Sequence, residues 1–235
     1  MPYRKVTWSE SDQRISIYNC GCNFSCIGCS YKLLQPQLEK PVPVERIEEL
    51  LAHYRPRKVT FLGGECTTNP ALPRLLAFSK REIGAETWLG HTNGSKLPLP
   101  DLDGANVSLK AFSPEKHREY TGYPAEPIYA NFRAGFEAGL QMKASAVYIP
   151  GFLDLDELEP MAEFLASLSP DLPFHLMGFV PVPGTTWPRP TEEQMARAVD
   201  VVRRHLRRVS YSHLTVEDMR NWQQRSKRWA SIQIA

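Results

Sequence analysis

The residues with the clearest chemical potential lie together in the run from Cys20 to Cys29. Three of them, Cys22, Cys26 and Cys29, follow a C-x3-C-x2-C spacing. Three thiolates can hold a [4Fe-4S] cluster while one iron keeps no protein ligand, so a small molecule can bind that iron and receive an electron. The spacing therefore predicts a cluster that takes part in chemistry.

Two alternatives to a cluster stay open. Cys20 adds a fourth thiol that would suit a structural zinc ion, although zinc ribbons usually carry two C-x2-C pairs and this chain has one. Disulfides fit poorly, because five cysteines, Cys66 being the fifth, and a start without the apolar core of a signal peptide are not typical of a secreted protein. A non-catalytic iron-sulfur or zinc protein that binds an acidic partner is the alternative of a different class.

The composition is that of an ordinary soluble protein, and the cytoplasm is the expected location. Hydrophobic residues make up 42% of the chain and charged residues 23%, and no apolar run approaches the roughly 20 residues that cross a bilayer. We expect one domain over residues 1–235, with a core over about residues 14–208 and a basic C-terminal extension over 209–235.

Basic residues concentrate near the C-terminus. The segment from Arg203 to Arg228 holds eight of the 28 basic residues and two of the 26 acidic ones. Trp222 lies within this segment and Trp229 directly follows it. Such a segment can contact nucleic acid or an acidic partner, but the solvated face of a terminal helix is the more common role. We therefore expect neither a nucleic-acid partner nor a membrane.

Short β-branched and aromatic runs alternate with longer amphipathic stretches through most of the chain. This pattern predicts strands over residues 14–20, 58–64, 86–94, 106–112, 142–149 and 174–180. It predicts helices over residues 44–53, 71–83, 127–139, 155–168 and 192–207, and a loop over the proline-rich residues 95–104.

Six strand–helix units in sequence favour an α/β fold, namely an open, partial (β/α)6 barrel of parallel strands resembling part of a TIM barrel. Six strands are too few to close such a barrel. Reactive groups gather at the C-terminal ends of its strands, and the cysteines follow the first expected strand. The end of each later strand carries further polar or glycine residues, as the Gly63-Gly64-Glu65 run shows after the second.

The Gly63-Gly64-Glu65 run permits close approach of a ligand to the backbone, because glycine has no Cβ, and its carboxylate can bind an amine. With the cysteine run one unit upstream, the chain resembles the radical S-adenosylmethionine (radical SAM) superfamily. Residues 107–122, 148–151 and 173–178 are similar, within that superfamily, to the branch of pyruvate formate-lyase-activating enzymes.

The resemblance implies an enzyme of the oxidoreductase type whose cofactors are a [4Fe-4S] cluster and S-adenosylmethionine (SAM). Reductive cleavage of SAM would yield methionine and a 5′-deoxyadenosyl radical that abstracts hydrogen from a substrate. Cys22, Cys26 and Cys29 would be the catalytic residues and the ligands of the metal cluster. A flavodoxin or a ferredoxin would supply the electron.

The resemblance also implies which residues bind SAM. These residues come from the ends of several strands and comprise Gly63, Gly64, Glu65, Thr92, Asn93, Lys110 and His175. The first three would meet the methionine amino group, Lys110 would face the SAM carboxylate, and His175 would approach the ribose or adenine. A snorkelling Lys110 and an ordinary half-buried His175 are the structural alternatives.

Three departures from the branch surround these residues. The usual Asp-Gly-Pro-Gly stretch is absent from residues 9–15. The branch holds a monovalent cation with two aspartates, and this chain has His91 and Ser108 in their places, so we expect no such site. Gly28 replaces the aromatic residue that usually precedes the last cluster cysteine, which predicts a more flexible cluster loop and less packing on the adenine side.

The substrate is expected to be a protein or peptide, with hydrogen abstraction from a group such as the glycine Cα of a glycyl radical enzyme. A maturase or an enzyme that modifies a small molecule or cofactor is the alternative. The proline-rich residues 181–190, which include Trp187, suit either a substrate lid or a plain connector.

The cysteine spacing leads to a first prediction. Anaerobic reconstitution should give a brown protein with about four irons and four sulfides per chain. Reduction with dithionite in the presence of SAM should then release 5′-deoxyadenosine, and Cys26→Ala should abolish the release. A colourless wild-type protein with one bound zinc would contradict the prediction.

Overall fold

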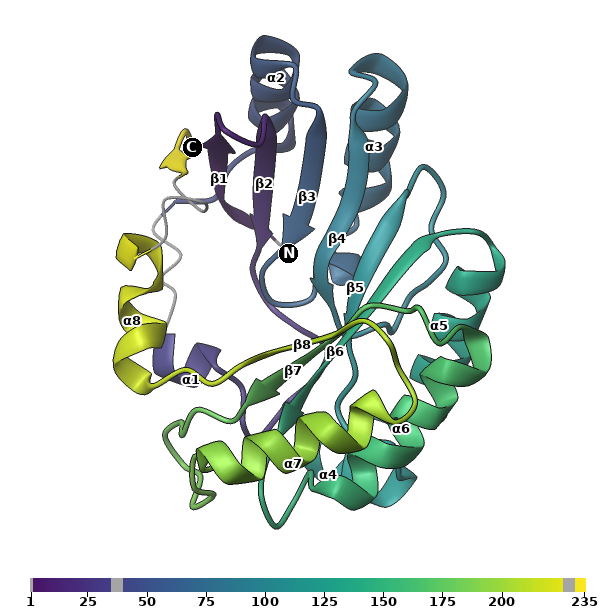
Figure 1. The fold of residues 1–235 in the computed structure, drawn as a ribbon. Coiled ribbons are helices and arrows are strands. Elements are labelled where there is room, and N and C mark those ends of the chain that lie inside the picture. The colour runs from purple at the N-terminus through teal and green to yellow at the C-terminus, as the bar shows by residue number, and fades with distance from the viewer. Residues whose placement is uncertain (1, 35–39, 226–230) are drawn as a thin grey trace.

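The strands form one curved, open sheet in the computed structural model, which describes residues 2–34, 40–225 and 231–235. The strands are β1 (Tyr3–Ser9), β2 (Arg14–Asn19), β3 (Lys58–Leu62), β4 (Glu86–Thr92), β5 (Gly104–Ser108), β6 (Gln141–Tyr148), β7 (Phe174–Gly178), β8 (Val209–Ser212) and β9 (Ile232–Gln233). Their order in the sheet is β8-β7-β6-β5-β4-β3-β2-β1-β9. The sheet does not close, so the expected partial barrel is confirmed (Figure 1).

Helices cover the convex side of this sheet (Figure 1). The α-helices are α1 (Tyr31–Leu34), α2 (Val44–Tyr54), α3 (Leu72–Ala77), α4 (Pro114–Thr121), α5 (Glu126–Glu137), α6 (Leu155–Leu168), α7 (Glu192–Arg203) and α8 (Val216–Arg225). Two short helical turns complete the set, the 3-10 helix η1 (Cys66–Thr68) and the π-helix η2 (Phe78–Glu82), which continues α3.

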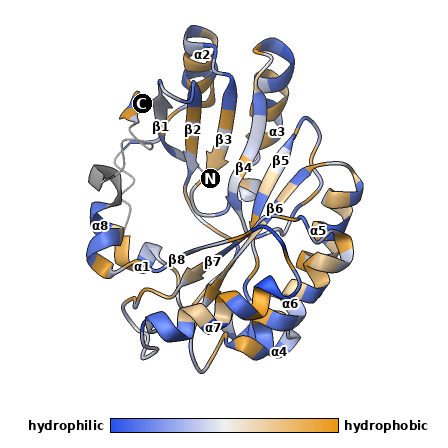
Figure 2. Ribbon diagram, viewed as in Figure 1, coloured by the Kyte–Doolittle hydropathy of each residue, from blue (hydrophilic) through white to orange (hydrophobic). Residues whose placement is uncertain are grey.

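The two faces of the sheet differ sharply in polarity. The outer face carries apolar side chains such as Phe61, Leu89 and Phe174, which are fully buried against the helices. We call the opposite side of the sheet the inner face. The parallel register places one row of residues across it, namely Ser16, Thr60, Trp88 and Gly104 on β2 to β5. Further along β5 to β8, the inner face carries mostly polar and charged residues, namely Asn106, Ser108, Lys143, Ser145, His175, Ser210 and Ser212. The outer helices are amphipathic, with orange and blue residues on the same helix (Figure 2).

All six expected strands are present, and β2 to β8 run parallel. Three further strands were not expected. β1 and β2 form an antiparallel hairpin, β8 extends the parallel array by one strand, and β9 pairs antiparallel with β1. The helices α1 and α4 were also not expected, whereas α8 agrees with the terminal helix favoured for the basic segment. The five other expected helices are present with ends shifted by a few residues.

The C-terminal segment joins the two edges of the open sheet. β8 lies at one edge and β9 at the other, and α8 lies between them across the open side in Figure 1. The backbone of β9 is held at Trp8, which pairs with Ile232, and by a 2.9 Å hydrogen bond from the Ile234 amide to the Val6 carbonyl. Much of the expected basic face, including Trp222 and Trp229, lies outside the described side chains. Within the described part of the chain, no helix has both the length and the apolar character of a membrane span.

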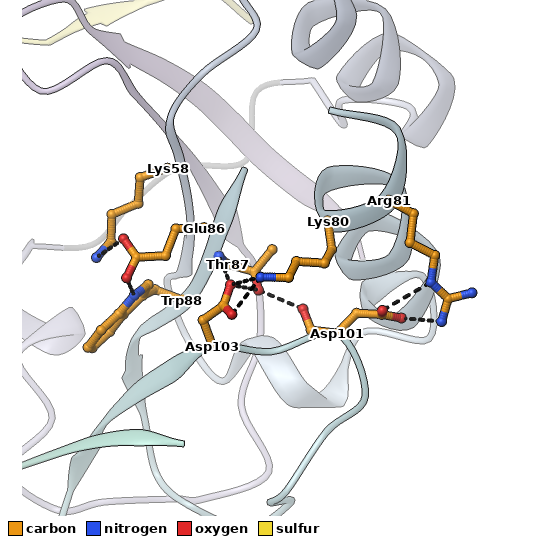
Figure 3. A network of polar contacts seen from close by, with 8 residues as sticks. All are labelled: Lys58, Lys80, Arg81, Glu86, Thr87, Trp88, Asp101 and Asp103. Atoms are coloured by element: carbon orange, nitrogen blue, oxygen red, sulfur yellow. Dashed lines mark hydrogen bonds and ion pairs between the residues drawn. The ribbon is translucent and has the colours of Figure 1, made fainter. Parts of the chain in front are cut away.

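The connection from β4 to β5 has no helix, as expected, and polar contacts hold it in place (Figure 3). Lys80 of η2 donates to both carboxylate oxygens of Asp103, at 2.6 and 2.9 Å, and Arg81 binds Asp101 in the same bidentate way. The Thr87 amide donates to Asp103 at 2.9 Å and its hydroxyl donates to the Asp101 carbonyl at 2.6 Å. These contacts take the place of a covering helix at the start of β5.

The Asp103 contacts lead to a prediction about stability and pH. Burial raises the pKa of Asp103, but hydrogen bonds from Lys80 and Thr87 outweigh that effect and hold the pKa below 3.8. Asp103→Asn should lower the free energy of unfolding at pH 7 by about 1–3 kcal/mol, because hydrogen bonds to a charged group are lost. A depressed carboxyl pKa adds stability above its unfolded-state value, so the difference should shrink as pH falls through the folded-state pKa.

Denaturant melts at several pH values measure this difference. Asp171→Asn is the matched control, because the Arg207–Asp171 pair is largely exposed on both sides and such pairs contribute little. The role assigned to the network would be contradicted if the two variants lost equal free energy of unfolding, or if the loss in Asp103→Asn persisted at low pH.

Candidate active site

The cysteine loop begins where β2 ends and is held by a helix that lies far away in sequence. The amides of Ser25 and Ile27 donate to the carbonyls of Thr121 and Tyr120, each at 2.9 Å. Both acceptors belong to the last turn of α4, so the helix aligns the loop through backbone contacts. This support was not expected from the sequence, although Ser113 before Pro114 is a typical helix start.

The three thiols of the loop are free, with Cys22 exposed and Cys26 and Cys29 half-buried. Burial raises the pKa of Cys26, while the positive charge of Lys110 acts in the opposite direction. Metal binding therefore has to displace protons from the loop. A cation close to the loop favours the thiolate form that a cluster needs.

The thiols of the loop do not meet at a single point. Among the described residues, no three His, Cys, Asp or Glu side chains converge as ligands of one metal ion. Each cysteine of a [4Fe-4S] cluster binds a different iron. Cys20 follows β2, and its amide donates to the Pro2 carbonyl at 3.1 Å, which ties its backbone to the start of β1.

The Gly63-Gly64 turn lies against the backbone of the cysteine loop. Both glycines have positive φ, 86° and 52°. A Cβ on Gly64 would lie 1.9 Å from the Gly21 carbonyl oxygen, and one on Gly63 would lie 2.7 Å from the Asn19 carbonyl oxygen. The Glu65 amide donates to the Gly21 carbonyl at 2.8 Å. The two glycines therefore allow the backbone of the cysteine loop to approach closely, a contact that the sequence did not predict.

The Glu65 carboxylate is buried, with 1% of the residue exposed, and joins the ends of β3 and β4. Its Oε1 accepts hydrogen bonds from the Thr67 hydroxyl at 2.7 Å and the Thr92 hydroxyl at 2.8 Å. Its Oε2 accepts from the Asn93 amide at 2.5 Å. The Asn93 side chain in turn donates to Asn23 of the cysteine loop at 2.8 Å. The structure thus brings the expected residues Glu65, Thr92 and Asn93 together beside the loop.

Lys110 lies just after β5, where its ammonium donates to the Ser108 hydroxyl at 2.7 Å. Its charge acts on the thiols of Cys22 and Cys26 and also on His91. Burial among the inner-face groups is the main cause that lowers the pKa of His91 to about 4, and Lys110 and His175 lower it further. His91 is therefore neutral at pH 7.

His175 lies on β7 and faces the neighbouring strand β8. Its Nδ1 is 2.8 Å from the Ser210 hydroxyl and its Nε2 is 3.1 Å from the Ser212 hydroxyl. Burial lowers its pKa. His175 thus shares the inner face with His91, while its direct hydrogen bonds go to serines and not to the other expected site residues.

The space beside Gly28 is filled, which the sequence did not predict. A Cβ on Gly28 would lie 2.6 Å from the Tyr120 hydroxyl and 3.1 Å from Cε2 of Phe179. The Tyr120 ring from α4 fills the space, and Cys26 packs on the same apolar cluster. Trp187 completes this cluster by stacking on Phe152 with ring centroids 4.5 Å apart.

The site has clear relatives among known proteins. Residues 16–165 match the family described as the Radical SAM superfamily. A putative glycyl-radical enzyme activating enzyme of Methanocaldococcus jannaschii is 28% identical over 211 residues, which cover 85% of this chain and 80% of the relative. A probable GTP 3′,8-cyclase of Methanosarcina mazei is 33% identical over 180 residues, 70% of this chain and 52% of the relative. The chain thus spans about half the length of that cyclase.

Solved structures share the fold. Streptococcus suis SuiB bound to S-adenosylmethionine superposes with a TM-score of 0.64 at 17% identity, over 82% of this chain and 48% of that chain. A domain of pyruvate-formate lyase-activating enzyme from Bacteroides vulgatus superposes with a TM-score of 0.53 at 22% identity, over 66% of this chain and 98% of that chain.

The contact between the glycine turn and the cysteine loop gives a prediction with a matched control. Gly64→Ala should displace the loop, because its Cβ overlaps the Gly21 carbonyl, and should sharply reduce the iron retained after reconstitution. Gly84→Ala imposes the same left-handed strain at φ 76° but has no atom within 4 Å of the new Cβ. The control should lose only about 1 kcal/mol of stability and keep wild-type iron. Equal iron contents in the two variants would contradict the role of this contact.

Proposed function

The chain belongs to the radical SAM superfamily, and from this premise we propose that it abstracts hydrogen from a protein or peptide substrate, as an activating enzyme does. Like other members, it is an enzyme that uses a [4Fe-4S] cluster and SAM. The residues fit these cofactors, because three thiols share one loop and a lysine and a buried carboxylate lie beside it.

When bound, the cofactors would supply the radical chemistry, namely reductive cleavage of SAM and hydrogen abstraction from the substrate. The protein has to bind and orient SAM at the open iron. We assign Cys22, Cys26 and Cys29 to the cluster. We assign Lys110 to the SAM carboxylate, because its ammonium acts on both Cys22 and Cys26.

The amino end of SAM would meet the turn that contains Gly63, Gly64 and Glu65. Glu65 would act in two ways there: it orients Thr92 and Asn93 through its hydrogen bonds, and it places a negative charge near the ammonium of SAM. His175 is the candidate for the ribose or adenine end.

Exclusion of water from the radical falls to the apolar cluster beside the cysteine loop. Tyr120, Phe152, Phe179 and Trp187 pack together there, and Cys26 and Ile27 pack against them. Trp187 belongs to the proline-rich segment 181–190, so this segment forms one wall of the site. An apolar wall protects a reactive intermediate from side reactions.

We choose a protein or peptide substrate because this chain covers more of the activating-enzyme relative than of the cyclase. The M. jannaschii relative named as an activating enzyme is covered to 80% of its length, whereas the M. mazei cyclase is covered to 52%. A Thauera aromatica benzylsuccinate synthase activating enzyme is also similar, at 30% identity over 46% of this chain. The alternative, a small-molecule modifying enzyme, rests on the higher identity to the cyclase, 33%.

A fractionation experiment tests the proposal. Reconstituted enzyme, SAM and dithionite are mixed with either the macromolecules or the small molecules of cells that carry the gene, separated by ultrafiltration. The macromolecular fraction should stimulate release of 5′-deoxyadenosine and give a radical signal on a polypeptide by electron paramagnetic resonance. Cys26→Ala controls for background cleavage. Stimulation by the small-molecule fraction alone would establish the alternative.

The electron donor is tested in the same assay. We propose that reduced flavodoxin or ferredoxin replaces dithionite, because the cluster needs a one-electron donor of low potential. Cleavage of SAM with dithionite but with neither protein would overturn this assignment.

A further inference from the structure

Two lysines on the inner face lie over one tryptophan ring. The ammonium groups of Lys58 and Lys143 are 3.9 and 4.7 Å from the centroid of Trp88. The ring extends from β4 across β5, where Gly104 makes room for it, because a Cβ there would lie 2.6 Å from Cζ2 of Trp88. Lys58 and Lys143 come from strands β3 and β6, which are not neighbours, so the ring draws their charges together.

Positive charges outnumber negative charges around the Trp88 ring. Glu86 pairs with Lys58 at 3.2 Å and also accepts from the Trp88 indole at 2.7 Å (Figure 3). Among the described side chains, Lys143 has no carboxylate partner within salt-bridge distance. The pKa of Lys58 is lowered, mainly by burial. Glu86 acts to raise this pKa, and the nearby charges of Lys143 and Arg14 act to lower it. Positive charges held together at a partly buried site are unfavourable until an anion joins them.

A track of polar contacts leads from Lys143 to Lys110, which we assign to SAM. Asn106 pairs in register with Lys143, and its amide lies 3.3 Å from Nδ1 of His91. His91 reaches the inner face because the register of β4 shifts between Leu89 and Thr92. Beyond His91 lies Lys110, whose charge acts on it.

The length of the track is that of a nucleotide or a short peptide. Gly104 lies beside Trp88, and Ser108 binds Lys110. Ser108 follows Gly104 by four residues on β5, which corresponds to about 13 Å along the strand at the usual rise per residue. A molecule anchored at Lys143 can therefore extend to the SAM end of the inner face. Lys143 is exposed, so this end of the track is open to such a molecule.

We propose that Lys58 and Lys143 bind an anionic group of the substrate, a carboxylate or a phosphate, while His91 and Asn106 contact the part that reaches toward SAM. The inference rests on the proposed function and names the chemical class of its substrate. Neutral His91 with its Nδ1 beside the Asn106 amide is suited to donate a hydrogen bond through Nε2. Lys143 is then a substrate-binding residue that discriminates in favour of anions.

Isothermal titration of the reconstituted protein in the presence of SAM tests the site with two probes. Inorganic tripolyphosphate stands for a phosphate group, and glutarate stands for the carboxylate of an acidic side chain. Wild type should bind at least one of them, and the stronger of the two identifies the source of the anion. Lys143→Met should weaken binding about tenfold to a hundredfold, because a hydrogen bond to a charged group is lost.

Two controls accompany this variant. Lys143→Arg keeps the charge and should retain binding, and Arg203→Met removes one charge from an exposed position on α7 and should bind as wild type does. The inference is overturned if wild type binds neither probe, or if Lys143→Met binds like wild type. SAM cleavage by wild type is measured separately, so failure of the proposed function shows as absence of 5′-deoxyadenosine and not as absence of anion binding.

Discussion

The close contact between the Gly63-Gly64 turn and the cysteine loop is the constraint on which the active site depends. A Cβ at Gly64 would lie 1.9 Å from the Gly21 carbonyl oxygen, so only glycine allows the two backbones to meet. The Glu65 amide seals the contact, and its carboxylate holds the end of β4. Three chain segments that are distant in sequence are thus fixed to one another before any cofactor binds. Such preorganisation lowers the cost of orienting a cofactor and its substrate.

Because the sheet is open, its inner face can receive a cofactor and a substrate. A closed eight-stranded barrel fills its interior with side chains, whereas here the inner face keeps Lys143 and Ser210 exposed. Among the described residues, the apolar clusters lie on the outer face and around Tyr120 and Trp187. The connection between β4 and β5 shows how the fold manages without one of its helices: two bidentate ion pairs, at Asp101 and Asp103, hold a loop where other units have a helix.

The sequence was sufficient to predict the parts of the molecule that depend on local patterns. Alternating apolar residues located β2 to β7, and the spacing of the cysteines located the loop that follows β2. The strand β1 was missed because Tyr-Arg-Lys-Val-Thr-Trp-Ser alternates only in its second half. The strand β8, Val-Ser-Tyr-Ser, does alternate, but four residues are too short a run to predict a strand, and pairing with the sheet makes both segments strands. Tyr120 could not be found in this way. It fills the space beside Gly28 from a helix some 90 residues further along the chain, and no local pattern carries that contact.

The replacement of two carboxylates by His91 and Ser108 has a consequence for the electrostatics of the whole inner face. With aspartates in these positions, negative charge would lie next to Lys110 and compensate it. Instead Lys110 meets a hydroxyl at 2.7 Å and a histidine whose pKa is about 4, so neither neighbour carries charge at pH 7. Lys58 shares Glu86 with the Trp88 indole, and Lys143 adds a further positive charge over the same ring. Charges in a partly buried site interact strongly, so the positive potential extends from the cysteine loop to the start of β3 and favours anions along this length. The departures around the cysteines and the lysines on the inner face therefore act in the same direction.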